Sequence, residues 1–239
     1  MSADQFEALL AVQAVDTEID QLRHRRATLP ERAKLKEAND RLAALERDRV
    51  GVAEHNDALT AAGHKLEDDI AAVTGKATEV DRTLYSGTVS APRELTALQE
   101  EIAALGRRQR ALEDKLLELM EEAEPVEAEL LSLDDERAEL DTIAVNLTAD
   151  LAEAEAEIDT ALTALTSRRF DAAIPVPSDL LSDYEKLRDR LGGIGVARLV
   201  GNRCGGCHLT LSAVEVDRIK HVTPDEVVHC EECGRLLVR

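Results

Sequence analysis

Residues 95–165 decide the fold, and they read LTALQEEIAALGRRQRALEDKLLELMEEAEPVEAELLSLDDERAELDTIAVNLTADLAEAEAEIDTALTAL. Apolar side chains recur here at alternating spacings of three and four residues, and 19 of the 21 positions in the series are apolar. The series is Leu95, Leu98, Ile102, Leu105, Gln109, Leu112, Leu116, Leu119, Ala123, Val126, Leu130, Leu133, Arg137, Leu140, Ala144, Leu147, Leu151, Ala154, Ile158, Ala161 and Leu165. About ten unbroken heptads are typical of a coiled coil, since helices of globular domains average about three turns. The sequence therefore predicts one long helix with a narrow apolar seam that a second helix must cover.

A second heptad series lies upstream. It begins a helix over residues 3–28 and is interrupted at Leu29-Pro30, where proline removes a helical hydrogen bond. The series resumes and continues to Leu84, with Arg49, Asn56 and Gly63 at non-apolar seam positions. A buried asparagine can fix the register of two helices, and the alternative is that the seam is loose there.

The periodicity stops at residues 85–92, YSGTVSAP, whose glycine, serines and proline are typical of a turn. Two heptad helices joined by a short loop predict an antiparallel coiled-coil hairpin over residues 1–172 with its tip at 85–92. Residue i of the first arm is expected to face roughly residue 177 − i of the second. The fold class expected is mainly α.

Charge supports this pairing. Residues 23–49 hold nine bases and five acids, whereas the facing residues 128–154 hold eight acids and one base. Ion pairs between the two arms explain the basic cluster, and a nucleic-acid patch is the alternative. The net charge of the whole chain is −20, which disfavours binding of free nucleic acid along most of the hairpin.

Composition excludes other classes of protein. Of the 239 residues, 33% are charged and 2% aromatic, a profile of long helices rather than of a globular core. No apolar run approaches the ~18 residues that a membrane span needs, and no signal peptide is visible. We therefore expect a cytoplasmic protein that does not act in a membrane.

The sequence pattern changes near residues 172–177, where AIPVP indicates the end of the hairpin and a semi-rigid linker. Ser178 is expected to cap a short helix, and short β-like runs follow from Val196. Residues 178–239 are therefore predicted to form a small C-terminal α+β domain.

This C-terminal segment contains all four cysteines, as Cys204-Gly-Gly-Cys207 and Cys230-Glu-Glu-Cys233. Two such pairs at this separation predict a zinc site with four thiolate ligands. Four thiolates fill a tetrahedral shell, so one structural zinc ion is expected rather than a catalytic one. Another tetrathiolate metal and a redox pair are the alternatives, and the redox pair lacks the βαβ context it would need. His208 and His229 flank the cysteines and are expected outside the first coordination shell.

These features resemble a bacterial family that combines a coiled-coil hairpin with a C4-type zinc ribbon. The resemblance rests on the tip, LYSGTV at 84–89 with PREL at 92–95, and on the tail, CGGCH at 204–208 with CEECGRLLV at 230–238. Arg93 departs from the lysine expected at that position. Members are described as proposed nucleic-acid-binding zinc-ribbon proteins, and some act as adapters for regulatory or secretion-apparatus proteins. The resemblance implies no enzymatic activity.

Two functions follow from these features. A non-enzymatic adapter would bind a protein partner, with Arg82, Tyr85 and Arg93 at the tip as candidate contacts, because aromatic rings on loops often bind. Alternatively, Tyr85 only covers the hairpin end.

A nucleic-acid-binding ribbon would use a basic face, although six acids offset six bases from Ile194 onward. Its candidate residues are Arg198, Arg203, Arg218, Lys220 and Arg235. No arrangement typical of a catalytic site is present, so an enzyme is not expected.

Overall fold

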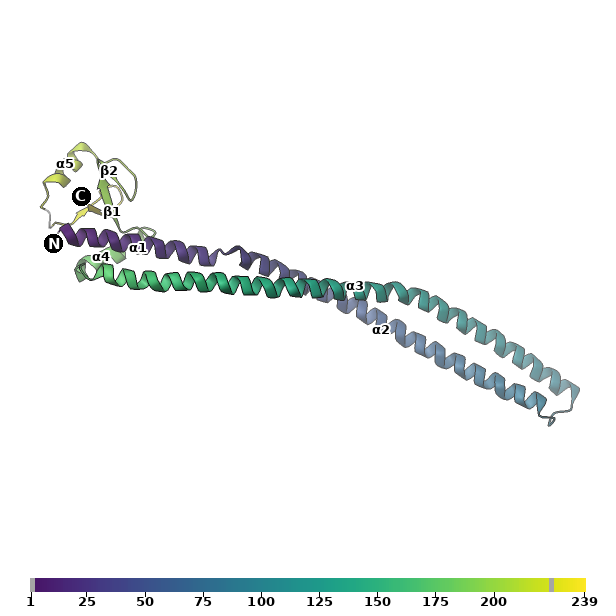
Figure 1. The fold of residues 1–239 in the computed structure, drawn as a ribbon. Helices are drawn as coiled ribbons and strands as arrows, with labels where there is room; N and C mark the ends of the chain where they lie inside the picture. Colours follow the sequence, from purple (N-terminus) through teal and green to yellow (C-terminus); the bar gives the residue numbers. More distant parts are fainter. Residues whose placement is uncertain (1–2, 224–225) are drawn as a thin grey trace. The chain divides into compact units, whose positions relative to one another are not determined.

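The structure is a computed structural model that describes residues 3–223 and 226–239. It divides into two compact units, one of Lys34–Asn146 and one formed by the segments before and after it. Figure 1 labels most of the helices and strands. The helices are α1 (Ala3–Ala27), α2 (Pro30–Tyr85), α3 (Pro92–Ala173), α4 (Ser178–Arg190) and α5 (Ala213–His221), and the strands are β1 (Val196–Val200), β2 (Arg203–Cys204), β3 (Val228–His229) and β4 (Leu236–Val238). No helix among the described residues has an apolar stretch long enough to cross a membrane.

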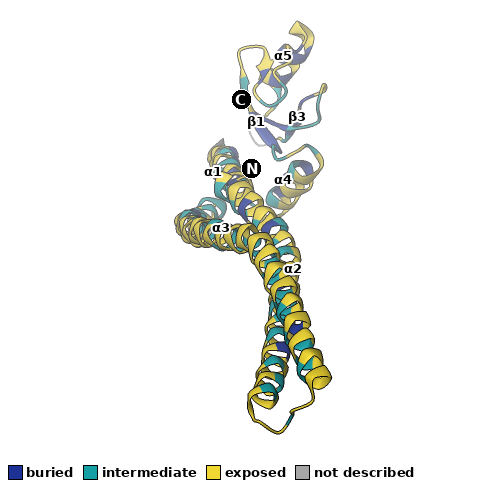
Figure 2. Ribbon diagram, turned by 90° about the vertical axis from the view of Figure 1, so that its right-hand side faces the viewer, coloured by how far each residue is buried: buried dark blue, intermediate teal, exposed yellow. Residues whose placement is uncertain are grey.

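The Lys34–Asn146 unit is the paired part of α2 and α3, joined by the loop at 86–91. The predicted antiparallel coiled-coil hairpin is thus confirmed. Its buried side chains recur at multiples of seven residues on each helix, and the remainder of both helices is largely exposed (Figure 2). They are Ala38, Leu45, Leu59 and Val73 on α2 and Leu105 and Leu140 on α3. Only some heptads contain a fully buried residue, and most other seam side chains are partly exposed, because a single helix faces each seam.

Two of the non-apolar seam positions have distinct roles. A Cβ atom built at Gly63 would lie 3.3 Å from Leu119 Cδ2, so glycine makes room for that leucine. The Oδ1 atom of Asn56 is buried and has no hydrogen-bond partner among the described residues. Asn56 therefore does not fix the register through a hydrogen bond to this oxygen.

Ion pairs between the two arms bear out the interpretation of the basic cluster. Arg41 pairs with Glu136 at 2.7 Å and Lys76 with Glu101 at 2.8 Å, and in each pair the residue numbers add to 177 as expected. Toward the base the register differs, since Arg26 pairs with Asp159 at 2.8 Å and these numbers add to 185. Most of these side chains are exposed, so each pair contributes little to stability and mainly selects the register.

The interruption at Pro30 is confirmed, because α1 ends at Ala27 and α2 begins at Pro30. The hydroxyl of Thr28 donates back to the His24 carbonyl at 2.8 Å, and so it closes α1 rather than capping α2. Pro125 lies inside α3 without ending it.

The second unit joins the base of the hairpin to the C-terminal segment in a shared core. Phe6, Leu9 and Val12 of α1 contact Leu180 and Tyr184 of α4, and the same core includes residues of β1 and β4. The strand order is β2-β1-β4-β3, with β1 and β4 parallel and the two outer pairs antiparallel. Helix α3 ends at Ala173, and residues on both sides of the linker expected at 172–177 share one core. Ser178 does not cap α4, since no side-chain capping hydrogen bond is present at that helix start.

Candidate functional site

The four cysteines converge at one point of the C-terminal segment. Their sulfur atoms all lie within 4.8 Å of one another, and Cys204 Sγ is 4.0 Å from Cys233 Sγ. Cys204 and Cys230 are buried, whereas Cys207 and Cys233 are partly exposed, and none forms a disulfide. Cys204 ends β2, and Cys230 directly follows β3, so the sheet fixes one sulfur of each pair.

The backbone around each pair is folded so that amides approach the sulfur atoms. In the first pair the Gly206 N–H donates to Cys204 Sγ at 3.4 Å, and the Gly205 N–H donates to the Arg198 carbonyl at 2.9 Å. A Cβ atom at Gly205 would lie 2.9 Å from that carbonyl oxygen, so a larger residue would force the loop away from β1. In the second pair Gly234 has φ +74° and donates to the Cys230 carbonyl at 2.7 Å. Glycine is favoured at this left-handed position.

The metal-free thiols differ in acidity. Burial raises the pKa of the Cys230 thiol to about 12. Burial also opposes ionisation of Cys233, but hydrogen bonds to it, led by the backbone N–H of Arg235, outweigh this effect and lower its pKa to about 7. Cys233 therefore ionises before Cys230, and the Cys230 thiol must lose its proton as metal binds.

This arrangement fits one zinc ion. The four sulfur ligands are the donor set that zinc prefers in structural sites, and they leave no position for a catalytic water. Zinc bound here would fix the two loops to each other and so stabilise a segment with a small core. His208 has φ +61° and lies next to Cys207, but four thiolates already complete the shell.

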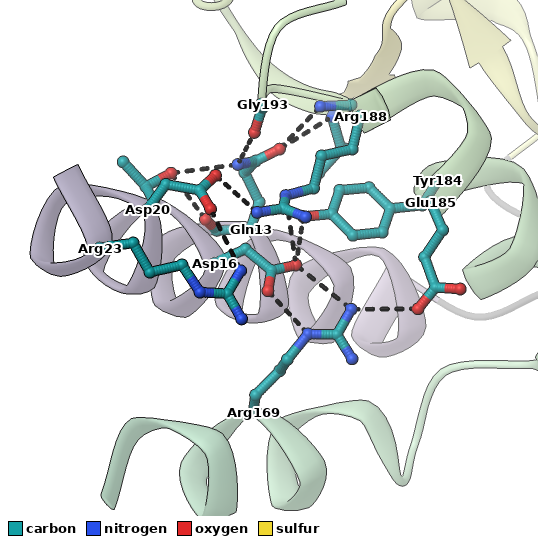
Figure 3. A network of polar contacts seen from close by, with 12 residues as sticks. Gln13, Asp16, Asp20, Arg23, Arg169, Tyr184, Glu185, Arg188 and Gly193 are labelled. Carbon is teal, nitrogen blue, oxygen red and sulfur yellow. Dashed lines mark hydrogen bonds and ion pairs between the residues drawn. The ribbon is translucent and has the colours of Figure 1, made fainter. Parts of the chain in front are cut away.

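A buried polar network lies in the same unit, between α1, α3 and α4 (Figure 3). Asp16 is 2% exposed and accepts hydrogen bonds from Arg169 Nε at 2.7 Å and from the Tyr184 hydroxyl at 2.8 Å. Arg188 lies on the other side and donates to Asp20 at 2.5 Å. Burial and the hydrogen bond to Asp16 raise the pKa of Tyr184 well above its usual value, so the phenol stays protonated and remains a donor.

The loop after α4 is attached to α1 by Gln13, the second buried polar residue of this network. Its side-chain amide donates to the Gly193 carbonyl at 2.9 Å and its carbonyl accepts from the Gly195 N–H at 2.8 Å. Sequence reasoning missed Gln13 and Asp16, because a single polar residue in a helix gives no signal of a distant partner. The apolar residues of α1 did give an indirect signal of further packing partners, because they cover a wider face of the helix than contact with one partner helix requires.

Comparisons with known proteins agree with this structure. The family model of the CT398-like coiled coil hairpin domain matches residues 12–192, and that of the C4-type zinc ribbon domain matches residues 203–237. The chain belongs to the CT398-like hairpin family. Its resemblance to hairpin and zinc-ribbon proteins is thereby confirmed, as are the fold class and the zinc ribbon.

Several relatives are similar over nearly their whole length. The uncharacterized Mycobacterium tuberculosis protein Rv2229c is 36% identical over 242 residues, which cover 98% of this chain and 95% of that protein. A structure from Mycobacterium smegmatis has a TM-score of 0.89 at 29% identity, covering 100% of this chain and 99% of the other. The structure of CT398 from Chlamydia trachomatis has a TM-score of 0.71 at 21% identity over 98% and 97% of the two chains, which supports the fold alone.

In this member of the CT398-like hairpin family, most of the cations predicted to form a nucleic-acid face have partners within the chain. Arg198 pairs with Glu7 at 2.5 Å, and Arg218 pairs with Glu215 at 2.6 Å. Arg203 donates to the His208 carbonyl at 3.0 Å, and Arg235 donates to the carbonyls of Leu191 and Ile194 at 3.0 and 2.9 Å. Lys220 is exposed. The structure therefore uses four of the five candidates to hold the ribbon together.

The tip residues of the hairpin are arranged differently. Tyr85 is 79% exposed at the end of α2, so it does not cover the hairpin end. Arg82 and Arg93 are exposed too, and Arg93 lines a shallow groove on the first turn of α3 with Pro92, Thr96, Ala97 and Glu100. The binding role expected for these three residues stays a prediction.

Proposed function

We propose that this chain is a non-enzymatic adapter that binds a protein partner at the hairpin tip. The observation that carries the proposal is the exposure of Tyr85, one of four aromatic residues in the chain, at the end of α2 next to the loop that joins two long paired helices. Placing a tyrosine in solvent has no benefit for folding, whereas tyrosine is enriched among residues that contribute most to protein–protein binding.

The remaining features of the chain fit a scaffold rather than an enzyme. The zinc ligands fill the coordination shell, so the metal is expected to be structural. The buried network of Asp16, Arg169 and Tyr184 is enclosed between helices, where it fixes their positions. A paired helical arm of this kind is rigid, and loops on rigid scaffolds are suited to binding.

Binding of RNA or DNA through the ribbon is the alternative function. Lys220 is the one candidate cation without a hydrogen bond or ion pair to another described residue, and the arginines around the zinc loops already donate to carboxylates and carbonyls. A sequence-independent interaction with phosphates would weaken steeply as salt increases. A filter-binding assay at two salt concentrations tests it, and binding at low salt that is lost at high salt would favour it.

The test of the adapter proposal compares two exposed aromatic residues. Zinc-loaded full-length protein serves as bait in a nuclease-treated lysate of the native host, with Tyr85→Ala as the variant. Phe170→Ala is the matched control, because Phe170 is 70% exposed and lies near the far end of α3. We expect a discrete protein to be recovered by the wild type and by Phe170→Ala but not by Tyr85→Ala, with equal melting temperatures. Equal recovery by Tyr85→Ala would refute binding at the tip.

A further inference from the structure

Helix α3 has a second apolar stripe that no other helix covers. Leu117, Leu131, Ala138 and Val145 follow one another at spacings of 14, 7 and 7 residues, and all four are exposed. Met120 and Ala128 lie beside them on the same helical face, since they are three residues from Leu117 and Leu131. We call these six residues the outer stripe. Leu131 and Val145 are each 67% exposed, and Leu117 and Met120 are each 59% exposed.

The outer stripe is separate from the seam of the hairpin. The seam of α3 includes Leu105 and Leu140, which are buried, whereas the stripe residues are exposed and lie outside the seam positions. In a two-helix coiled coil these positions are normally polar, because no partner covers them. Large apolar residues that repeat there with the heptad period add nothing to the hairpin itself. Their period is the one that a further helix lying along α3 would require.

The charges beside the stripe define what kind of helix fits. Residues 113–146 contain 13 acids and two bases. Some of these acids are paired within the hairpin, as Asp134 is with Arg49. Within residues 3–223 and 226–239, no cation lies within ion-pairing distance of Glu124, Glu127, Asp135 or Glu139, which are all exposed. Glu127, Asp135 and Glu139 flank the stripe, and Glu124 occupies one of its heptad positions. Unpaired acids flanking an apolar stripe select a partner with basic flanks.

These charges argue against a second copy of this chain as the occupant. Two outer stripes in contact would bring the unpaired Glu127, Asp135 and Glu139 of each chain to the same interface, and residues 113–146 of each chain contain only two bases. Like charges at flanking positions of a coiled coil destabilise the pair. The repulsion would be strong because few cations of this segment are free to offset it.

We propose that the outer stripe docks a basic amphipathic helix from a protein partner. The helix would present apolar residues at heptad spacing toward Leu117, Leu131 and Val145, and lysine or arginine at its flanks toward the unpaired acids. The stripe extends over 28 residues, or about 42 Å, so the partner helix would need about eight turns to cover it all. Glu124 interrupts the series at one heptad position and would pair with a cation in the partner's seam, which would fix the register.

The proposal deepens the adapter function, on which it rests, by naming a second surface and the chemistry of its partner.

The probe is a designed 28-residue peptide with leucine at heptad spacing and lysine at the flanks. A peptide of the same composition with a scrambled order has the same charge but no stripe, and it serves as the peptide control. Binding of each labelled peptide to the full-length, zinc-loaded chain is measured by fluorescence anisotropy at two salt concentrations.

The variant is Leu131→Gln with Val145→Gln, and Ile143→Gln is its matched control. Ile143 is 48% exposed in the same segment of α3 but lies off the stripe. We expect the double variant to weaken binding of the heptad peptide by about tenfold or more, because two buried contacts are lost, while the control changes it by less than about twofold. Circular dichroism should show the same helix content in all three proteins.

Three results would overturn the proposal. The first is equal affinity for the scrambled peptide, which would show that charge alone accounts for binding of the heptad peptide. The second is an equal loss in the Ile143→Gln control. The third is a dimer in sedimentation velocity that the double variant converts to monomer, which would assign the stripe to a second copy of the chain. None of these depends on Tyr85, so failure here is distinguishable from failure of partner binding at the tip.

Discussion

Replacing Asp16 by alanine should destabilise the unit that contains the hairpin base and the ribbon. Asp16 accepts from Arg169 at 2.7 Å and from Tyr184 at 2.8 Å, and its side chain is nearly inaccessible to solvent. Breaking a buried ion pair by removing one partner typically costs 3–5 kcal/mol. The two arginines keep other acceptors, since Arg169 also reaches Glu185 at 3.1 Å and Arg188 reaches Asp20 at 2.5 Å. We therefore expect a loss of about 3 kcal/mol, at the low end of that range.

The sequence offers a clean assay for this prediction. The chain has no tryptophan and two tyrosines, so Tyr85→Phe leaves Tyr184 as the single intrinsic fluorophore of that class. Urea unfolding of zinc-saturated protein in this background reports on the network itself. Asp159→Ala is the control, because Asp159 pairs with Arg26 on the surface, where solvent screens the interaction. A loss below about 1 kcal/mol for Asp16→Ala, or one equal to that of Asp159→Ala, would refute the reasoning.

Three further predictions concern the zinc site and two glycines. Burial raises the pKa of Cys230 to about 12 and also raises that of Cys207, so zinc must displace protons. Apparent zinc affinity should therefore fall about tenfold or more from about pH 8 to about pH 6 in competition with a chromophoric chelator, and an affinity independent of pH would contradict this. Gly51→Ala should raise the free energy of unfolding by up to about 1 kcal/mol, because nothing lies within 4 Å of the added Cβ. Gly205→Ala should weaken zinc binding, because its Cβ would lie 2.9 Å from the Arg198 carbonyl oxygen.

The hairpin and the metal ligands could be predicted because their signals are local and repeated. The apolar pattern that forms the seam of α2 and α3 recurs in each heptad. A wrong assignment at one position would therefore not change the predicted hairpin. The two Cys-x-x-Cys pairs define ligands by spacing alone. The position of the tip could be predicted because a periodic pattern stops and turn residues begin, and in the structure α2 ends at Tyr85 and α3 begins at Pro92.

The base of the hairpin was harder to predict because its contacts join residues that are far apart in sequence. Phe6 and Leu9 of α1 share a core with α4 and with strands β1 and β4, and the heptad pattern of α1 does not indicate these contacts. The arginines of the ribbon were equally ambiguous. Arg239 donates to the carbonyls of Ile219, Val222 and Thr223 near the end of α5, a capping role that sequence cannot distinguish from a free basic face.

The zinc site is connected to the helices by a continuous series of hydrogen bonds. The backbone N–H of Arg235 approaches the Cys233 sulfur, and its guanidinium donates to the Leu191 and Ile194 carbonyls of the loop after α4. Gln13 of α1 holds the same loop through Gly193 and Gly195. Because Arg235 lies two residues from a metal ligand, zinc fixes the position from which it reaches that loop. Loss of zinc should therefore loosen both the ribbon and the attachment of α1 to α4, so the metal supports the base from which the hairpin extends.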